Sequence, residues 1–141
     1  MHLTNDAVQD RNEEYGKYEP GNKISMSDFA KYVKEEFKID FYKKIFPKMK
    51  EAVKHTLMAF WSSSQAYNKI REKPLIPNQF ELFGYDFMID QDFKVYLIEV
   101  NTNPCLDTSP CALLQRLIPT VLDQTFKVCV DPFLSNLDQK K

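Results

Sequence analysis

Asp86 and Glu99 interrupt the two most hydrophobic runs of this 141-residue sequence. Asp86 lies in the run 80–89 and Glu99 lies in the run 95–100, and both runs are rich in aromatic and β-branched residues. Such residues are typical of β-strands, and the polar residues 90–92 between the runs indicate a turn. The sequence therefore predicts an antiparallel hairpin that carries one carboxylate on each strand.

Pairing across this hairpin is expected to bring the two carboxylates together. The predicted turn closes with Ile89 facing Tyr96. Three steps back from that pair Asp86 lies directly opposite Glu99, because each step along one antiparallel strand is matched by a step back on the other. Opposed Cβ atoms are ~4.5–5.5 Å apart. Asn101 follows Glu99 by two residues, so its side chain is expected on the same face.

Two adjacent carboxylates and an amide oxygen suit a hard divalent cation. Like charges at this distance repel each other, and burial strengthens the repulsion. Mg²⁺ binds one or two carboxylates plus water and substrate phosphates, whereas Ca²⁺ typically takes about six to eight oxygen ligands. The pattern favours Mg²⁺ at Asp86, Glu99 and Asn101, with open room at Gly84 opposite Asn101. A proton shared by the two acids, a Lys or Arg partner, and an edge strand with solvated acids are the alternatives.

An amphipathic helix is expected ahead of the hairpin. Residues 1–24 are polar and rich in turn-forming residues. Ser25, followed three residues later by Asp28, resembles a capping pair, and apolar residues then recur at helical spacing. The sequence predicts a helix over 26–38.

A second helix is expected from Pro47 to about Trp61, which itself is expected to pack at the helix end. The apolar stripe expected to face the core consists of Met49, Val53, Leu57 and Phe60. The serines at 62–64 are expected to end this helix, and residues 65–78 to form a loop.

Basic residues surround the start of the second helix. They are Lys43, Lys44, Lys48, Lys50 and Lys54. Such a stretch can face an acidic partner, and a simple solvated helix face is the alternative.

A third helix is expected to begin at Ser109 and Pro110. Pro119 is expected to kink or restart that helix. The polar segment from Pro132 to the C-terminus is expected to be frayed.

The composition is that of one soluble globular domain. The chain is 43% hydrophobic and 28% charged, and a chain of this length buries roughly 68% of its unfolded surface without needing disulfides or metal to fold. The net charge of −1 implies no broad attraction to nucleic acid or anionic membranes. No run approaches ~18 apolar residues, and the polar N-terminus is unlike a signal peptide. The three cysteines fit reduced thiols in a cytoplasmic protein.

The residues around the carboxylates closely resemble the C-terminal signature of the tubulin–tyrosine ligase and ligase-like family. The resemblance includes residues 80–90, residues 97–101 and Asn103-Pro104. The tetrapeptide at residues 2–5 matches the second signature of that family, and residues 15–22 resemble its tyrosine ligase. The similarity covers roughly residues 1–131 and implies an α+β fold that is the C-terminal portion of an ATP-grasp fold, followed by a polar tail at 132–141.

The resemblance implies an ATP-dependent ligase that joins an amino acid to tubulin through an acyl-phosphate intermediate. The implied cofactors are ATP and Mg²⁺. The implied partners are a free amino acid and the acidic C-terminal tail of tubulin, with no nucleic acid and no membrane. The implied location is the cytoplasm and cytoskeleton, or a cilium.

Individual residues receive roles through the same resemblance. The implied magnesium ligands are Asp86, Glu99 and Asn101. The implied nucleotide contacts are His2, Leu3, Thr4 and Asn5. For the latter group the alternatives are a turn capped by Thr4 and Asn5 and a structural role for His2.

In that family these motifs end a much longer chain, whose earlier part supplies the adenine-binding strand and the lysines that hold phosphates. We therefore expect this chain to be the C-terminal part of a ligase and to be catalytically incomplete alone. It could be a truncated gene product, one half of a split gene or a genuine short product. The alternatives are a non-catalytic tubulin-binding or regulatory module that retains the fold, and a metal-stabilised α+β domain of unrelated purpose.

Overall fold

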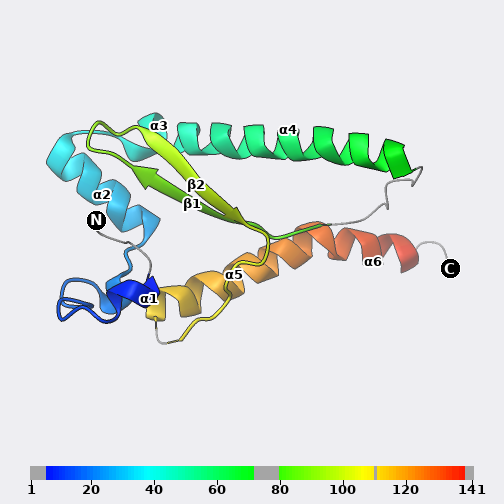
Figure 1. The fold of residues 1–141 in the computed structure, drawn as a ribbon. Coiled ribbons are helices and arrows are strands. Elements are labelled where there is room, and N and C mark those ends of the chain that lie inside the picture. Colours follow the sequence, from blue (N-terminus) through cyan, green and yellow to red (C-terminus); the bar gives the residue numbers. More distant parts are fainter. Residues whose placement is uncertain (1–5, 72–79, 110, 139–141) are drawn as a thin grey trace. The chain divides into compact units, whose positions relative to one another are not determined.

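A computed structural model describes residues 6–71, 80–109 and 111–138 of the chain. The described residues form helices and a two-stranded antiparallel sheet (Figure 1), in agreement with the expected α+β class. In chain order the elements are α1 (Asp6–Gln9), the 3-10 helix η1 (Pro20–Asn22), α2 (Met26–Phe37), α3 (Phe41–Lys44), α4 (Phe46–Arg71), β1 (Gly84–Ile89), β2 (Val95–Asn101), α5 (Ala112–Cys129) and α6 (Asp131–Asp138). The chain divides into two compact units, one of residues 30–105 and one of residues 1–29 with 106–141.

The core of the 30–105 unit is small and combines aliphatic with aromatic side chains. Its most deeply buried large side chains are Val33, Phe41 and Ile45. In addition, Phe37 at the end of α2 packs edge-on against Phe93 in the hairpin turn, with ring centroids 5.2 Å apart. Aromatic pairs of this kind stabilise beyond their buried area, so this contact helps to fix the hairpin turn against α2.

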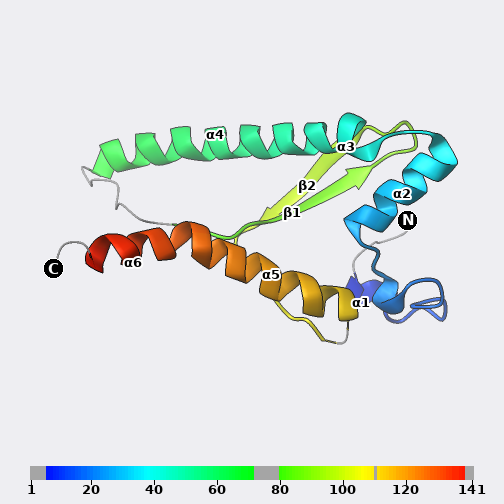
Figure 2. The ribbon, with the colours of Figure 1, turned by 180° about the vertical axis from the view of Figure 1, so that it is seen from behind.

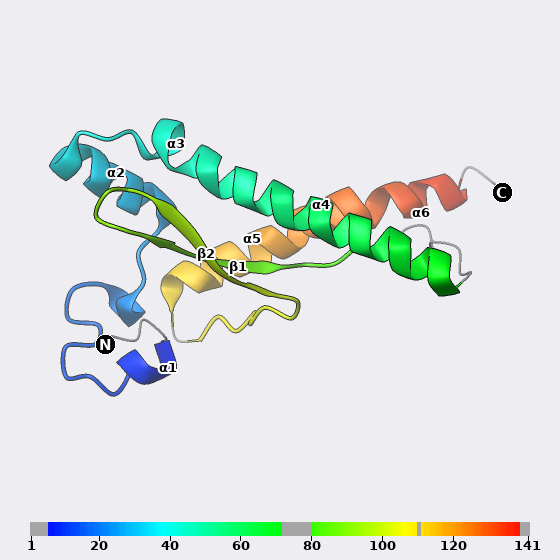
Figure 3. The same ribbon diagram turned by 45° about the horizontal axis from the view of Figure 1, so that its top comes forward.

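Helix α4 lies beside the hairpin and contacts it (Figures 1 and 3). The hydroxyl oxygens of Thr56 on α4 and Tyr85 on β1 are 2.8 Å apart and share a hydrogen bond. The ring of Phe87 stacks on that of Tyr85 at a centroid distance of 6.1 Å. Because side chains alternate along a strand, Asp86 lies on the opposite face of the sheet from these two rings.

The predicted cap of α2 is present. The Ser25 hydroxyl oxygen accepts a hydrogen bond from the Asp28 backbone N–H at 3.0 Å, and it donates one to the Asp28 carboxylate. The helix predicted over 26–38 ends at Phe37, and Lys38 follows it with a φ of 58°. The prediction of this helix is therefore confirmed to within one residue.

Removal of this cap is expected to destabilise the protein. Ser25→Ala deletes the acceptor for the Asp28 N–H and should lower the free energy of unfolding by about 1 kcal/mol. Urea denaturation followed by circular dichroism measures this change. Ser63→Ala, an exposed serine inside α4, is the matched control and should leave the unfolding midpoint unchanged or slightly raised. Equal effects of the two substitutions would contradict the capping role.

The predicted end of α4 was wrong. The helix runs through the three serines to Arg71, so the loop expected from residue 65 is helical as far as Arg71, and residues 72–79 lie outside the described residues. Serine weakens a helix only slightly, and neither glycine nor proline occurs between residues 48 and 73.

The expected core-facing stripe of α4 is only half correct. Met49 and Val53 are partly buried, whereas Leu57 and Phe60 are 44% and 57% exposed. The second half of α4 therefore leaves large apolar side chains in solvent.

The other unit contains α5 and α6 (Figure 2). Helix α5 begins at Ala112 with Cys111 at its N-cap, so the cap predicted at Ser109 was wrong, and residue 110 lies outside the described residues. The helix continues through Pro119 without a break. Helix α6 occupies Asp131–Asp138, where a frayed segment was expected from Pro132. An acidic residue followed by proline is a favourable helix start, which explains the difference. Within the described ranges no helix combines the length and apolar character that a membrane crossing requires.

Candidate functional site

The hairpin turn sets a register one residue away from the predicted one. Ile89 pairs with Val95 instead of Tyr96. Asp90 organises the turn, because its Oδ1 accepts two backbone N–H groups at 3.0 and 2.9 Å and its Oδ2 accepts the Tyr96 hydroxyl at 3.0 Å. The pKa of the Asp90 carboxyl is lowered, mainly because the carboxylate accepts the hydrogen bond from the Lys94 backbone N–H.

A β-bulge next to the carboxylates cancels this one-residue difference. Phe87 still pairs with Leu97 in the register of the turn, but the next pair is Asp86 with Glu99, so Ile98 is an extra residue on β2. A bulge of this kind opposes two residues on one strand to one residue on the other. Asp86 therefore lies opposite Glu99, which is the predicted pairing, although the predicted register at the turn was wrong.

Asn101 joins the carboxylate pair. It pairs with Gly84 across the hairpin, as predicted, and its Nδ2 lies 3.4 Å from Oε1 of Glu99. A 180° rotation of the side-chain amide exchanges its nitrogen and its oxygen. The structure thus brings Asp86, Glu99 and Asn101 together on one exposed face of the hairpin.

The electrostatics of this face are those of two acids whose negative charges repel each other. Burial raises the pKa of Asp86, and a hydrogen bond with Glu99 and the repulsion of its charge raise it further. Among the described residues, no three His, Cys, Asp or Glu side chains cluster in a way that would hold a metal ion. A site here would therefore use two carboxylates and one amide. That donor set fits Mg²⁺, which needs only one or two protein carboxylates, and a cation would remove the repulsion between the acids.

The open room predicted at Gly84 is filled. A Cβ atom built on Gly84 would lie 3.0 Å from Cβ of Pro104 and 3.6 Å from Cβ of Asn101. Pro104 therefore closes over the backbone beside Asn101 and helps to position it. The sequence contains this signal in the Asn103-Pro104 dipeptide, but the close approach itself depends on how the chain turns after β2.

Gly84→Ala is expected to disturb Asn101. The new methyl group would press on the rigid Pro104 ring, so the free energy of unfolding should fall by about 1 kcal/mol, as in other overpacked sites. A double-mutant cycle with Pro104→Gly, measured by urea denaturation, tests the cause. The cost of Gly84→Ala should largely vanish when Pro104 is glycine, and a cost that persists would contradict this contact as its origin.

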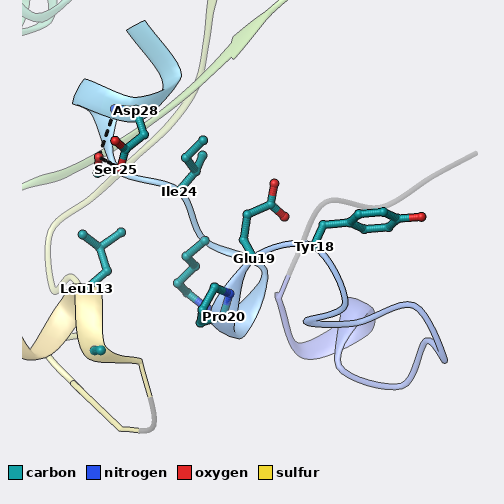
Figure 4. Close-up of a pocket in the computed structure, with 9 residues that line it drawn as sticks. Tyr18, Glu19, Pro20, Ile24, Ser25, Asp28 and Leu113 are labelled. Atoms are coloured by element: carbon teal, nitrogen blue, oxygen red, sulfur yellow. Dashed lines mark hydrogen bonds between the residues drawn. The ribbon is translucent and has the colours of Figure 1, made fainter. Parts of the chain in front are cut away.

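The remaining predicted residues lie elsewhere. His2, Leu3, Thr4 and Asn5 lie outside the described residues. A pocket of about 260 Å³ opens beside the N-terminus of α2 (Figure 4). Its charged lining residues are Glu19, Lys23 and Asp28. Two of these charged side chains already form hydrogen bonds within the chain. Lys23 donates to the Gly21 carbonyl at 3.1 Å, and Asp28 accepts from the Ser25 hydroxyl at the start of α2. The pocket includes none of the three residues gathered on the hairpin.

The chain belongs to the tubulin-tyrosine ligase family, because the sequence model of that family matches residues 1–138. The chain is 35% identical to tubulin glycylase 3B of Tetrahymena thermophila over 100% of its own length and 11% of that protein. It is 29% identical to protein polyglycylase TTLL10 of Rattus norvegicus over 99% of its length and 20% of that protein. It is 31% identical to inactive polyglycylase TTLL10 of Homo sapiens, again over 99% of its length and 20% of that protein. The chain thus spans about a tenth to a fifth of the length of these relatives.

Proposed function

We propose that this chain forms the magnesium-binding part of an ATP-dependent ligase with an ATP-grasp fold that joins glycine to tubulin. The observation that carries the proposal is the position of Asp86 opposite Glu99 with Asn101 beside them, in a chain of the tubulin-tyrosine ligase family. Glycine is favoured over tyrosine because the relatives described above are named as glycylases, despite the resemblance of residues 15–22 to the tyrosine ligase.

The residues of the hairpin have distinct tasks in this proposal. Asp86 provides one carboxylate oxygen to the ion, and Glu99 provides the second. Rotation of the Asn101 amide turns its oxygen toward the same point, while Pro104 holds the backbone there. Bound Mg²⁺ would neutralise charge on the phosphates of ATP and orient the γ-phosphoryl group. Residues 2–5 are proposed to contact the nucleotide, on the strength of the resemblance alone.

The proposed reaction has two balanced steps. A tubulin carboxylate attacks the γ-phosphorus of ATP, the bond to the bridging oxygen breaks, and ADP leaves. The amino group of glycine then attacks the acyl-phosphate carbon, phosphate leaves, and the nitrogen loses a proton to form the amide. We therefore propose that the protein acts on tubulin at the cytoskeleton. The chain is proposed to be catalytically incomplete alone. It covers only 20% and 11% of two relatives, which are therefore about five and nine times as long as this chain.

A non-catalytic tubulin-binding module is the second candidate function. It is favoured by one observation, the 31% identity to a human relative that is named as an inactive polyglycylase. The intact set of Asp86, Glu99 and Asn101 favours the ligase.

A chimaeric glycylase tests the two candidates. The segment of tubulin glycylase 3B that aligns with this chain is replaced by residues 1–141, and incorporation of radiolabelled glycine into tubulin is measured. The ligase proposal expects ATP-dependent incorporation by the chimaera and none by the 141-residue chain alone. A chimaera that folds and binds tubulin without incorporating glycine supports the non-catalytic module. Robust transfer by the isolated chain would overturn the proposal that it is incomplete.

A further inference from the structure

Two lysines of α4 point away from the hairpin. The helix contacts β1 through Thr56, and successive residues of an α-helix are rotated by about 100°. Lys54 therefore lies about 160° around the helix from Thr56, and Lys50 about 120°. Both residues are exposed. They are also on the other side of the sheet from Asp86, which faces away from Tyr85 and α4.

These lysines belong to a longer exposed row on α4. Spacings of four, three and four residues align Lys50, Lys54, Leu57 and Trp61 along one side of the helix, and we call these four residues the α4 row. Leu57 is 44% exposed and Trp61 is 57% exposed. The expectation that Trp61 packs at the end of the helix was therefore wrong, since α4 continues to Arg71. The row is basic in its first half and apolar in its second half.

The charges of Lys48, Lys50 and Lys54 on α4 are not neutralised within the described part of the chain. Neither Lys48, Lys50 nor Lys54 forms an ion pair there, and Lys50 lies over the Phe46 ring with its Nζ 5.3 Å from the centroid. By contrast, Lys17, Lys31 and Lys127 each pair with a carboxylate on their own segment. Unpaired ammonium groups beside exposed apolar surface complement a peptide that carries carboxylates.

We propose that the α4 row is a docking surface for a glutamate-rich peptide segment, separate from the carboxylate face of the hairpin. Carboxylates of the peptide pair with Lys50 and Lys54, with Lys48 adding to the local positive charge, and the hydrocarbon parts of the peptide cover Leu57 and Trp61. The proposal rests on the proposed function in one respect, since the acidic C-terminal tail of tubulin is the occupant that a tubulin ligase would meet.

The position of Trp61 provides a direct assay, because it is the only tryptophan in the sequence. The 141-residue chain is titrated with poly-glutamate peptide while Trp61 fluorescence is recorded, and with poly-glutamine peptide of the same length as the neutral control. Poly-glutamate should change the emission saturably, with an affinity that falls as NaCl is added. Poly-glutamine should cause no change.

Two triple variants with equal net charge separate a local site from general attraction. K48Q/K50Q/K54Q should raise the Kd for poly-glutamate about tenfold, because it removes two exposed ion pairs and the nearby positive charge of Lys48. K17Q/K31Q/K127Q removes the same charge from lysines that are already paired and should change the Kd by less than about twofold. Circular dichroism checks that both variants keep their helical content.

Several results would overturn the docking surface. Equal weakening by both triple variants would show that only net charge matters. Binding of a labelled poly-glutamate peptide, seen by anisotropy without any response of Trp61, would place the peptide elsewhere. A Trp61 signal that depends on protein concentration alone would show that a second copy of the chain covers the row. Glycine transfer by the chimaera is measured separately, so failure of the docking surface and failure of the ligase proposal are distinguishable.

Discussion

Glu99→Gln is expected to make the protein more stable without magnesium and to abolish its response to magnesium. The substitution removes the charge that opposes Asp86, so the repulsion across the hairpin disappears. It also removes one of two carboxylates from the proposed site, so Mg²⁺ loses a principal ligand. A purely structural acid pair would show the first effect without the second, which makes the combination diagnostic.

Thermal unfolding with EDTA and with Mg²⁺ measures both effects. At ten times its Kd a ligand stabilises by about 1.4 kcal/mol, which for a chain of this size raises Tm by about 4 °C. We expect this rise for the unmodified chain and none for Glu99→Gln or Asp86→Asn. Glu81→Gln, which changes net charge equally at an exposed position outside the strands, should retain the full rise.

Glu99→Gln should also suppress glycine transfer by the chimaeric glycylase. Electrostatic stabilisation by a bound metal is worth several kcal/mol in the transition state, so its loss should reduce the rate about hundredfold. Retention of transfer and of the Tm rise in Glu99→Gln would contradict magnesium binding at the hairpin.

Stability is expected to decrease as pH rises through the pKa of Asp86. That pKa is raised above its ordinary value of 3.8, so the folded protein holds this proton more tightly than the unfolded chain does. The contribution of Asp86 to stability is therefore complete below pH 3.8 and is lost as pH rises through the raised pKa. Added Mg²⁺ should reverse the loss, because it favours the deprotonated carboxylate.

Urea midpoints measured from acidic to neutral pH check this dependence. The difference between the unmodified chain and Glu99→Gln isolates the pair, since Glu99 causes part of the shift through its hydrogen bond and its charge. Glu99→Gln should lose less stability over the same interval. Asp90 has the opposite sign, since its lowered pKa contributes stability that is lost as pH falls, and it is common to both proteins. Parallel curves for the two proteins would show that Asp86 and Glu99 do not share a proton.

The carboxylate pair could be predicted from the sequence because two independent constraints converge on it. The aromatic and β-branched residues of the two runs identified the strands, and the acids stood out as exceptions within them. The turn was harder to predict, because its register depends on hydrogen bonds to Asp90 and on Phe93, which adopts a φ of 58° although it is not glycine. The residue type at position 98 does not indicate a bulge, since a β-branched residue such as Ile98 fits any strand position.

Other parts of the structure depend on contacts that the sequence pattern does not encode. The end of α4 was missed because three serines weaken a helix without stopping it. The exposure of Leu57 and Trp61 was missed because helical spacing identifies a common side of the helix without identifying what covers it. The close approach of Pro104 to Gly84 joins residues on the two arms of the hairpin, and only the folded chain brings them together.

The bulge at Ile98 also affects how the hairpin tolerates changes in length. If Ile98 were deleted, Glu99 would directly follow Leu97 and would still oppose Asp86, because the register of the turn would then extend unbroken along the strand. A homologue that is one residue shorter at this point can thus keep its acids paired, while its hairpin loses the extra twist that a bulge introduces. The twist of this hairpin and the pairing of its acids therefore do not depend on each other. Deletion of Ile98 would change the twist and would leave Asp86 opposite Glu99.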